Sequence, residues 1–134
     1  MNSKKVIEFD KLISNKKVLE YLESVSFVKA TSIQSECITP LIEKKNAIVF
    51  GKTGSGKTLG YLLPLIQNLK EAEAGSKEEE QTSAPKAVIV LPTRELALQV
   101  FSITKSISHF AKLRVRKLVG GDKGKSLTLS LIHI

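Results

Sequence analysis

The sequence predicts an α/β fold with a parallel sheet, because short apolar runs alternate with helical patterns along its 134 residues. Residues 47–50 and 87–91 are apolar runs rich in β-branched side chains, as in buried parallel strands, and residues 113–119 alternate in polarity like a third strand. Strands separated by helices are joined by right-handed crossovers, and such a sheet binds its ligands at the carboxyl ends of its strands.

Four segments have apolar side chains at the spacing of a helix: residues 15–25, 31–43, 56–69 and 94–110. Ser14 or Asn15 can cap the first of them. Pro40 and Pro64 fall inside the second and third, so we expect a bend at each, since proline removes a helical hydrogen bond. Residues 71–85, with five glutamates, are too polar to bury and predict a flexible surface insertion.

Residues 51–58 spell a complete phosphate-binding loop, Gly51-Lys52-Thr53-Gly54-Ser55-Gly56-Lys57-Thr58, of the form GxxxxGKT. Its glycines permit positive φ and a close approach of the backbone, so that N–H groups can wrap a β-phosphate. Lys57 adds a charge for the β- and γ-phosphates, Thr58 would place its hydroxyl on Mg²⁺, and a helix beginning near Gly56 directs its dipole at the same anions. The loop therefore predicts a nucleoside triphosphate site; the alternative is a glycine-rich turn that spells the motif by chance.

The composition is basic, with 21 Lys and Arg against 13 Asp and Glu and a formal net charge of +8. Such a surface suits a polyanion, although solvated lysines could account for half of the excess. The single cysteine, Cys37, excludes a disulfide framework or zinc cluster and fits a reducing compartment. Without a signal sequence or a run of about 20 apolar residues, we expect a soluble protein of the cytoplasm, nucleus or nucleolus with no membrane contact.

Four motifs follow one another in a recognisable order: residues 26–34, the loop 51–58, the hexapeptide 92–97 and the glycine pair 120–121. In this order they resemble the Q motif, phosphate loop, Pro-Thr-Arg-Glu-Leu-Ala motif and paired glycines of the DEAD-box ATP-dependent RNA helicases. The resemblance covers residues 9–121. It implies an incomplete RecA-like P-loop domain over residues 1–128, that is, the N-terminal part of the first RecA-like domain of a helicase.

The resemblance implies that the nucleotide is ATP, with Mg²⁺. Adenine offers a donor at N6 beside an acceptor at N7, and the amide of Gln34 carries the complementary acceptor and donor. Phe9, which lies 17 residues before Ser26 at the position of a family aromatic, would stack on the base. The alternative for Gln34 is a capping box with Thr31, since residues 31–34 have the form T-x-x-Q at a helix start.

A second implied partner is RNA. Pro92 ends the predicted strand, Thr93 can cap the next helix, and Arg94 adds a charge to N–H groups that suit a phosphate. By resemblance, this element and Gly120-Gly121 hold the RNA sugar-phosphate backbone independently of sequence. The alternative is a plain strand-to-helix turn. Six more basic residues could extend an RNA face or be a solvated surface: Lys112, Arg114, Arg116, Lys117, Lys123 and Lys125.

The sequence departs from the family pattern in places. Ser26 stands where the family usually has glycine, which puts the turn in doubt because a residue with a Cβ resists positive φ. Ala30 replaces a usual proline, and Gly51 a commoner alanine.

The family's Asp-Glu-Ala-Asp motif does not occur in the 134 residues, nor does a second RecA-like domain. We therefore expect a helicase fragment that alone does not turn over ATP, with a truncated, non-enzymatic ATP- or RNA-binding module, or another P-loop enzyme such as a kinase, as alternatives. Residues 129–134 resemble a translated cloning adapter, so we expect a non-native tail outside the fold; the alternative is a short strand.

Overall fold

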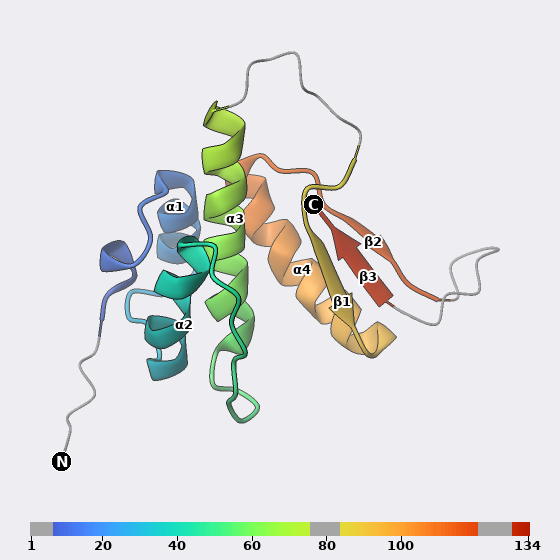
Figure 1. Ribbon diagram of the computed structural model, residues 1–134, viewed down its shortest axis with the longest axis horizontal. Coiled ribbons are helices and arrows are strands. Elements are labelled where there is room, and N and C mark those ends of the chain that lie inside the picture. Colours follow the sequence, from blue (N-terminus) through green and yellow to red (C-terminus); the bar gives the residue numbers. More distant parts are fainter. Residues whose placement is uncertain (1–6, 76–83, 121–129) are drawn as a thin grey trace. The chain divides into compact units, whose positions relative to one another are not determined.

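The computed structural model describes residues 7–75, 84–120 and 130–134 (Figure 1). The chain divides into two compact units, Met1–Gly75 and Ser76–Ile134. The first unit is helical and contains the phosphate loop, and the second combines one helix with a sheet.

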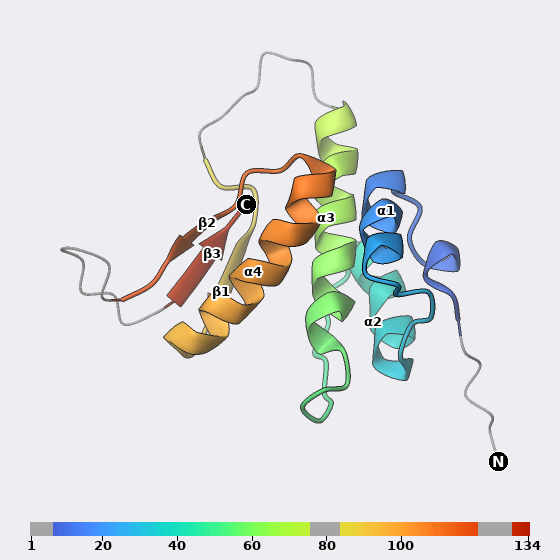
Figure 2. The ribbon, with the colours of Figure 1, turned by 180° about the vertical axis from the view of Figure 1, so that it is seen from behind.

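The first unit consists of a 3₁₀ turn and three helices: η1 (Phe9–Lys11), α1 (Lys16–Ser24), α2 (Ser32–Ile42) and α3 (Lys57–Gly75). Both α1 and α2 pack against α3, as Figures 1 and 2 show from opposite sides. The side-chain oxygen of Asn15 accepts hydrogen bonds from the N–H groups of Lys17 and Val18, so it caps α1 as the sequence predicts.

The core of this unit lies where the three helices meet. Its fully buried side chains include Ile13, Val18, Leu22, Ile38, Leu62, Leu63 and Ile66. The side-chain Oε1 of Gln67 accepts from the N–H groups of Ser14 and Asn15 at 2.9 and 3.2 Å, which fixes the start of α1 against α3. Pro40 and Pro64 lie inside α2 and α3, which both continue beyond them; the expected bends stay predictions.

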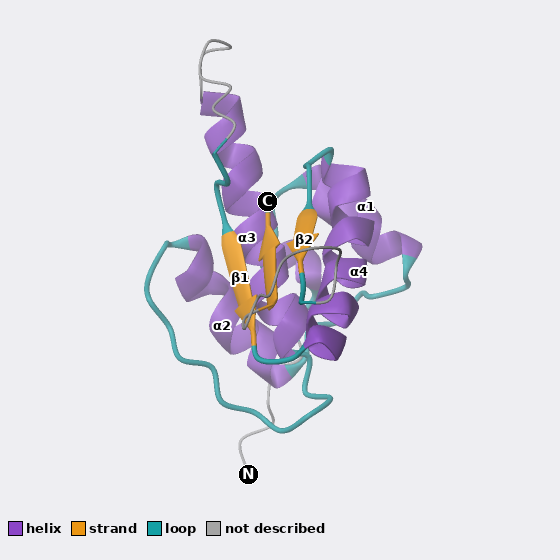
Figure 3. Cartoon of the chain, turned by 90° about the vertical axis from the view of Figure 1, so that its right-hand side faces the viewer, coloured by secondary structure: helices purple, strands orange, loops and turns teal. Residues whose placement is uncertain are grey.

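The second unit contains β1 (Val88–Leu91), α4 (Arg94–Ala111), β2 (Arg116–Leu118) and β3 (Ser130–His133). The strand order is β1-β3-β2, and β3 pairs antiparallel with both neighbours. Helix α4 covers one face of this sheet (Figure 3), and its Val100 and Ile107 are buried, as is Ile132 of β3.

The predicted parallel sheet is wrong for the described residues. β1 and β2 do run in the same direction, on either side of α4 in the chain, but β3 lies between them and pairs with both. The prediction of a buried strand at 87–91 also fails in part, since Val88 and Val90 are exposed. The reason is that α4 covers only one of the two sheet faces.

The predicted strand at residues 47–50 is not formed. These residues have no regular secondary structure, and the side chains of Ile48 and Phe50 are 85% and 88% exposed. A strand needs a neighbour for its backbone groups. Among the described residues no segment pairs with this one, so the phosphate loop follows an irregular segment instead of a strand end.

Two boundaries also differ from expectation. Residues 71–75 belong to α3, so this part of the flexible insertion expected at 71–85 is helical; residues 76–83 lie outside the described residues, and the insertion there stays a prediction. At the other end, Ser130–His133 is the middle strand of the sheet, and Ile134 exchanges backbone hydrogen bonds with Ala87. Residues 130–134 therefore belong to the sheet, as the alternative of a short strand predicts, whereas residue 129 lies outside the described residues and the non-native origin of residues 129–134 stays a prediction.

Candidate functional site

The phosphate loop turns sharply at two of its glycines. Gly54 and Gly56 have φ values of 79° and 91°, in the left-handed region that only glycine adopts without strain. A Cβ on Gly56 would also lie 2.5 Å from Nε2 of Gln34. Helix α3 begins at the next residue, Lys57, so its N-terminal N–H groups follow the turn as the sequence predicts.

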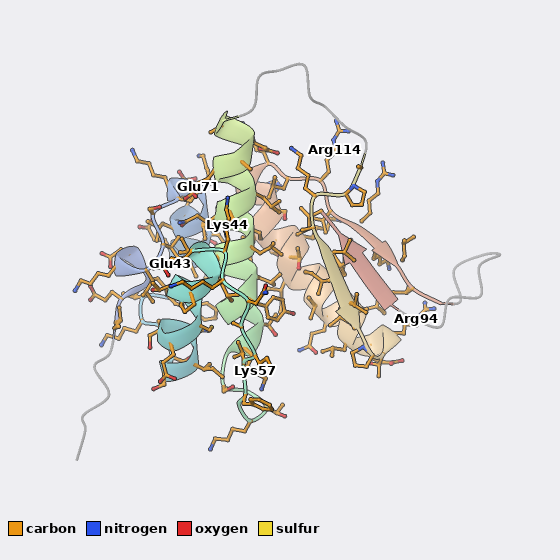
Figure 4. All side chains as sticks on the ribbon, viewed as in Figure 1. Glu43, Lys44, Lys57, Glu71, Arg94 and Arg114 are labelled. Atoms are coloured by element: carbon orange, nitrogen blue, oxygen red, sulfur yellow. The ribbon has the colours of Figure 1, made fainter. Side chains whose placement is uncertain are left out.

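The Lys57 side chain folds back onto this loop at the base of α3 (Figure 4). Its ammonium group donates to the carbonyl oxygen of Gly51 and, at 2.9 Å, to that of Lys52. These carbonyls are neutral acceptors and carry no charge opposite to that of the ammonium group. A phosphate brought to the loop would offer the same ammonium a stronger, charge-assisted partner.

A buried hydroxyl in the loop lacks a partner. Among the described residues, Oγ of Ser55 is one of three buried side-chain atoms without a hydrogen bond, and it lies 2.8 Å from the place of a Cβ on Gly51. An orphaned polar atom in a turn that leads into a helix N-terminus fits a loop shaped for a polar ligand. The residues present thus fit a bound phosphate chain.

The predicted Mg²⁺ ligand, Thr58, lies in the first turn of α3. Burial raises the pKa of the Tyr61 phenol, one turn further on, and a hydrogen bond with the Thr58 side chain acts in the opposite direction. Among the described residues no three His, Cys, Asp or Glu side chains gather as a metal site, and the role of Thr58 as an Mg²⁺ ligand stays a prediction.

Gln34 makes two hydrogen bonds at once. Its Oε1 accepts from the N–H of Thr31 at 2.8 Å, completing a capping box, and its Nε2 donates to the carbonyl oxygen of Gly56 at 3.0 Å. The capping box is therefore present. It does not exhaust the amide, because a glutamine has two N–H donors and two acceptor lone pairs. One of each remains, which is the pair that adenine needs, although the residue is only 4% exposed.

Sequence reasoning missed a second link between α2 and the phosphate loop. The Thr31 hydroxyl donates to the carbonyl oxygen of Ser55 at 2.9 Å while it also accepts from the N–H of Gln34. The T-x-x-Q pattern indicates the cap, but the contact with Ser55 spans 24 residues and has no local signal. The N-terminus of α2 is thus joined to the loop at two adjacent carbonyls.

Phe9 lies in η1 and is 3% exposed. Its N–H donates to the carbonyl oxygen of Val28 at 3.0 Å, and Glu8 and Lys29 form an isolated antiparallel bridge, which joins the N-terminal segment to residues 26–34. The ring would have to be uncovered before it could stack on a base. Its assigned role therefore stays a prediction.

Ser26 takes the conformation expected of the family's glycine, with φ at 58°. Its N–H donates to the Glu23 carbonyl oxygen at 3.0 Å, and the N–H of Phe27 donates to that of Leu22 at 2.8 Å. The turn after α1 is therefore kept despite the Cβ, and the doubt raised by the sequence is resolved.

In the second unit, Thr93 caps α4 by accepting from the N–H of Leu96 at 3.2 Å, and β1 ends immediately before Pro92. The Arg94 guanidinium donates to the carbonyl oxygen of Gly120 (Figure 4 labels Arg94). Two of the predicted RNA-binding elements therefore meet. Gly121 lies outside the described residues.

The surrounding basic residues do not form one uniform surface. Lys112, Arg114 and Arg116 are exposed, whereas the Lys117 ammonium lies 5.6 Å from the centre of the Phe101 ring on α4. A cation over an aromatic face is held by the ring's quadrupole. Lys117 is thus occupied within the protein, and Lys123 and Lys125 lie outside the described residues.

A lysine folded onto a glycine-rich turn at a helix N-terminus is the arrangement of P-loop nucleotide-binding proteins. Residues 31–133 match the family model of the DEAD/DEAH box helicases. The chain therefore belongs to the DEAD/DEAH box helicase family, which confirms the resemblance to DEAD-box RNA helicases and implies a RecA-like fold.

Individual relatives support this assignment. The DEAD-box ATP-dependent RNA helicase 39 of Arabidopsis thaliana is 38% identical over 90% of this chain, and the ATP-dependent RNA helicase DBP9 of Cryptococcus neoformans is 39% identical over 93%. The probable ATP-dependent RNA helicase ddx18 of Dictyostelium discoideum is 34% identical over 92%. The chain spans 20% of the length of each of these relatives. In the parts that the structure describes, no helix is long and apolar enough to cross a membrane.

Proposed function

We propose that this chain binds ATP and RNA as part of an ATP-dependent RNA helicase that unwinds or remodels RNA. The observation that carries the proposal is the contact between Gln34 and Gly56, because it joins a side chain complementary to adenine to the loop that would hold the phosphates. The names of the relatives, which describe ATP-dependent RNA helicases, support the same activity.

In the ATP-bound form, Lys57 exchanges the carbonyls of Gly51 and Lys52 for the β- and γ-phosphates. The N–H groups of residues 53–58 wrap the β-phosphate at the start of α3. Mg²⁺, held by Thr58 and the phosphates, would neutralise the charge that develops on the transferred group.

Gln34 selects the base. Its second amide N–H donates to N7 of adenine and its free lone pair accepts from the N6 amino group. Guanine carries an oxygen acceptor in place of that amino group, so its O6 would face the Gln34 oxygen and repel it. Phe9, once uncovered, would add affinity by stacking without adding selectivity.

RNA binds through its backbone. Thr93 and the N-terminal N–H groups of α4 receive a phosphate, Arg94 supplies charge from a position fixed by Gly120, and Gly120 with Gly121 lets the strand approach closely. Contacts to phosphate and sugar carry no base information. The binding is therefore independent of RNA sequence.

Hydrolysis needs carboxylates to hold the metal and position the attacking water, and the Asp-Glu-Ala-Asp motif does not occur in the 134 residues. We therefore propose that this polypeptide alone binds without turnover, as a truncated module would. Another P-loop enzyme, such as a kinase, leaves the Gln34–Gly56 contact and residues 92–97 without a role.

The test is equilibrium binding of a fluorescent ATP analogue to the purified chain with Mg²⁺. We expect saturable binding that Lys57→Ala weakens at least tenfold, because one charge-assisted contact to phosphate contributes about 1.5–3 kcal/mol. Lys70→Ala, on the same helix but paired with Glu73, is the matched control and leaves affinity unchanged. Equal binding by the Lys57 and Lys70 variants, or RNA-stimulated ATP hydrolysis by this chain, would contradict the respective parts of the proposal.

A further inference from the structure

Helices α2 and α3 contact each other at a cysteine and a glycine. The Cys37 thiol donates to the Gly60 carbonyl oxygen at 3.4 Å, and Cys37 is 7% exposed. A Cβ built on Gly60 would lie 2.8 Å from Sγ of Cys37, whereas ordinary van der Waals contact begins at 3.4 Å. The absence of a side chain at Gly60 therefore lets the two helices come this near.

One helical turn away lies the contact between Gln34 and the phosphate loop. Cys37 follows Gln34 by one turn on α2, and Gly60 follows Gly56 by one turn on α3. The Gly56 carbonyl oxygen accepts both from the Gly60 N–H at 3.1 Å and from Nε2 of Gln34 at 3.0 Å. The four residues thus form a closed frame in which the spacing at Gly60 fixes the distance at Gln34.

We propose that Gly60, by leaving room for the side chain of Cys37, keeps α2 and α3 close enough to position Gln34 and so sets the selectivity for the nucleotide base. This inference rests on the proposed role of Gln34 in reading adenine. Neither residue touches the nucleotide; both act through the separation of α2 and α3.

The distances show that a small increase in the separation of α2 and α3 would break the hydrogen bond between Gln34 and Gly56. A methyl group at residue 60 would lie more than half an ångström too close to Sγ of Cys37, and because that thiol is buried on a short side chain we infer that the helices move apart. The Gln34–Gly56 hydrogen bond is 3.0 Å long and ceases to be one near 3.6 Å. The same shift therefore releases Gln34 from the loop.

The thiol suits this position in its neutral form. Burial raises the pKa of the Cys37 thiol, so at neutral pH it remains protonated and can donate to the Gly60 carbonyl. Neighbouring Glu36 raises the pKa further, while a backbone hydrogen bond acts against it.

The experiment compares ATP and GTP affinities by competition against a fluorescent ATP analogue for four proteins: the wild-type chain, Gly60→Ala, Cys37→Ala and the double variant. We expect Gly60→Ala to lower the ratio of ATP to GTP affinity by about three- to tenfold, the worth of one hydrogen bond, with GTP affinity nearly unchanged. Cys37→Ala keeps the wild-type ratio. The double variant, with both Gly60→Ala and Cys37→Ala, regains the wild-type ratio of affinities, because removal of Sγ makes room for the new methyl group.

A general loss of stability would weaken the binding of ATP and of GTP alike and leave the ratio of the two affinities unchanged. A wild-type ratio in folded Gly60→Ala, or no recovery in the double variant, overturns the spacer. If Gly60→Ala does not fold, Cys37→Val enlarges the same contact from α2 and must lower the ratio. Gln34→Ala separates the two proposals: if the wild type prefers ATP and Gln34→Ala does not, selectivity by Gln34 stands whatever the spacer variants do.

Discussion

The amide of Gln34 donates to the carbonyl oxygen of Gly56 at 3.0 Å while it accepts from the N–H of Thr31 at 2.8 Å. One side chain therefore closes the cap of α2 and holds the last turn of the phosphate loop. The cap uses the oxygen of the amide and the contact with the loop uses its nitrogen, so each leaves one donor or acceptor position of the amide unused. The phosphate loop and the start of α2 are therefore linked through this side chain.

Ser26→Gly should stabilise the protein. Ser26 has φ at 58°, a conformation that costs a residue with a Cβ about 1–2 kcal/mol. Glycine avoids this cost, but its greater freedom in the unfolded chain offsets about 0.5–1 kcal/mol of the gain. We expect the free energy of unfolding in urea to rise by up to about 1 kcal/mol. Ser24→Gly, at the last residue of α1, is the control and should lower it, because it removes the hydrogen bond from the Ser24 hydroxyl to the Tyr21 carbonyl oxygen. A decrease for both variants would show that the turn at Ser26 is not formed in solution.

Arg94→Ala should weaken RNA binding by a similar factor for every sequence. Loss of one cation at the phosphate-binding element lowers the slope of log affinity against log salt by about one. Lys105→Ala, an exposed lysine in the middle of α4, is the matched control and should leave the slope unchanged. Filter binding of two unrelated single-stranded RNAs at several salt concentrations measures the affinity of each variant and the slope of that affinity with salt. A sequence-dependent loss would contradict backbone recognition.

Lys117 and Arg114 should differ in their contribution to the same salt dependence. The Lys117 ammonium is held over the Phe101 ring, whereas Arg114 is exposed. We therefore expect Arg114→Gln to reduce the slope and Lys117→Gln to change it less. The same titration compares them. A larger effect at Lys117 would mean that its contact with Phe101 is given up when RNA binds.

Stability should fall as the pH rises above about 9, and Cys37 should account for part of the fall. Burial raises the pKa of the thiol in the folded chain above its ordinary 9.0, so the unfolded chain loses this proton first. The contribution of the protonated thiol to stability is complete below its ordinary pKa of 9.0, and it disappears as the pH rises through the higher pKa of the folded chain. Urea unfolding at pH 7.5 and 9.5 should show a smaller loss for Cys37→Ala than for the wild type. Equal losses would mean that the thiol is not buried.

The helices could be predicted because their signals are local. Asn15 and Thr93 cap helices at the expected places, and the T-x-x-Q pattern at Thr31 forms the predicted capping box. Each of these interactions joins residues two or three positions apart, so the sequence carries the whole of it.

The sheet could not be predicted in the same way. Residues 47–50 have the composition of a strand, but strand formation depends on a partner that composition does not name. Ile132 occupies the centre of the sheet because Ile89 and Lys117, distant in the chain, lie on either side of it. At the site, the loop and Gln34 were predictable as motifs, whereas the link from Thr31 to Ser55 and the spacing at Gly60 are properties of helix packing.

The most direct test is a competition measurement in which ATP and GTP displace a fluorescent ATP analogue from the wild-type chain and from Gln34→Ala. The wild type should bind ATP more tightly than GTP, and Gln34→Ala should lose that preference. Gln99→Ala, an exposed glutamine on α4, should behave as the wild type does. Equal displacement of the analogue by ATP and GTP from the wild type, or an unchanged preference in Gln34→Ala, would contradict the assignment of Gln34 as the residue that joins adenine to the phosphate loop.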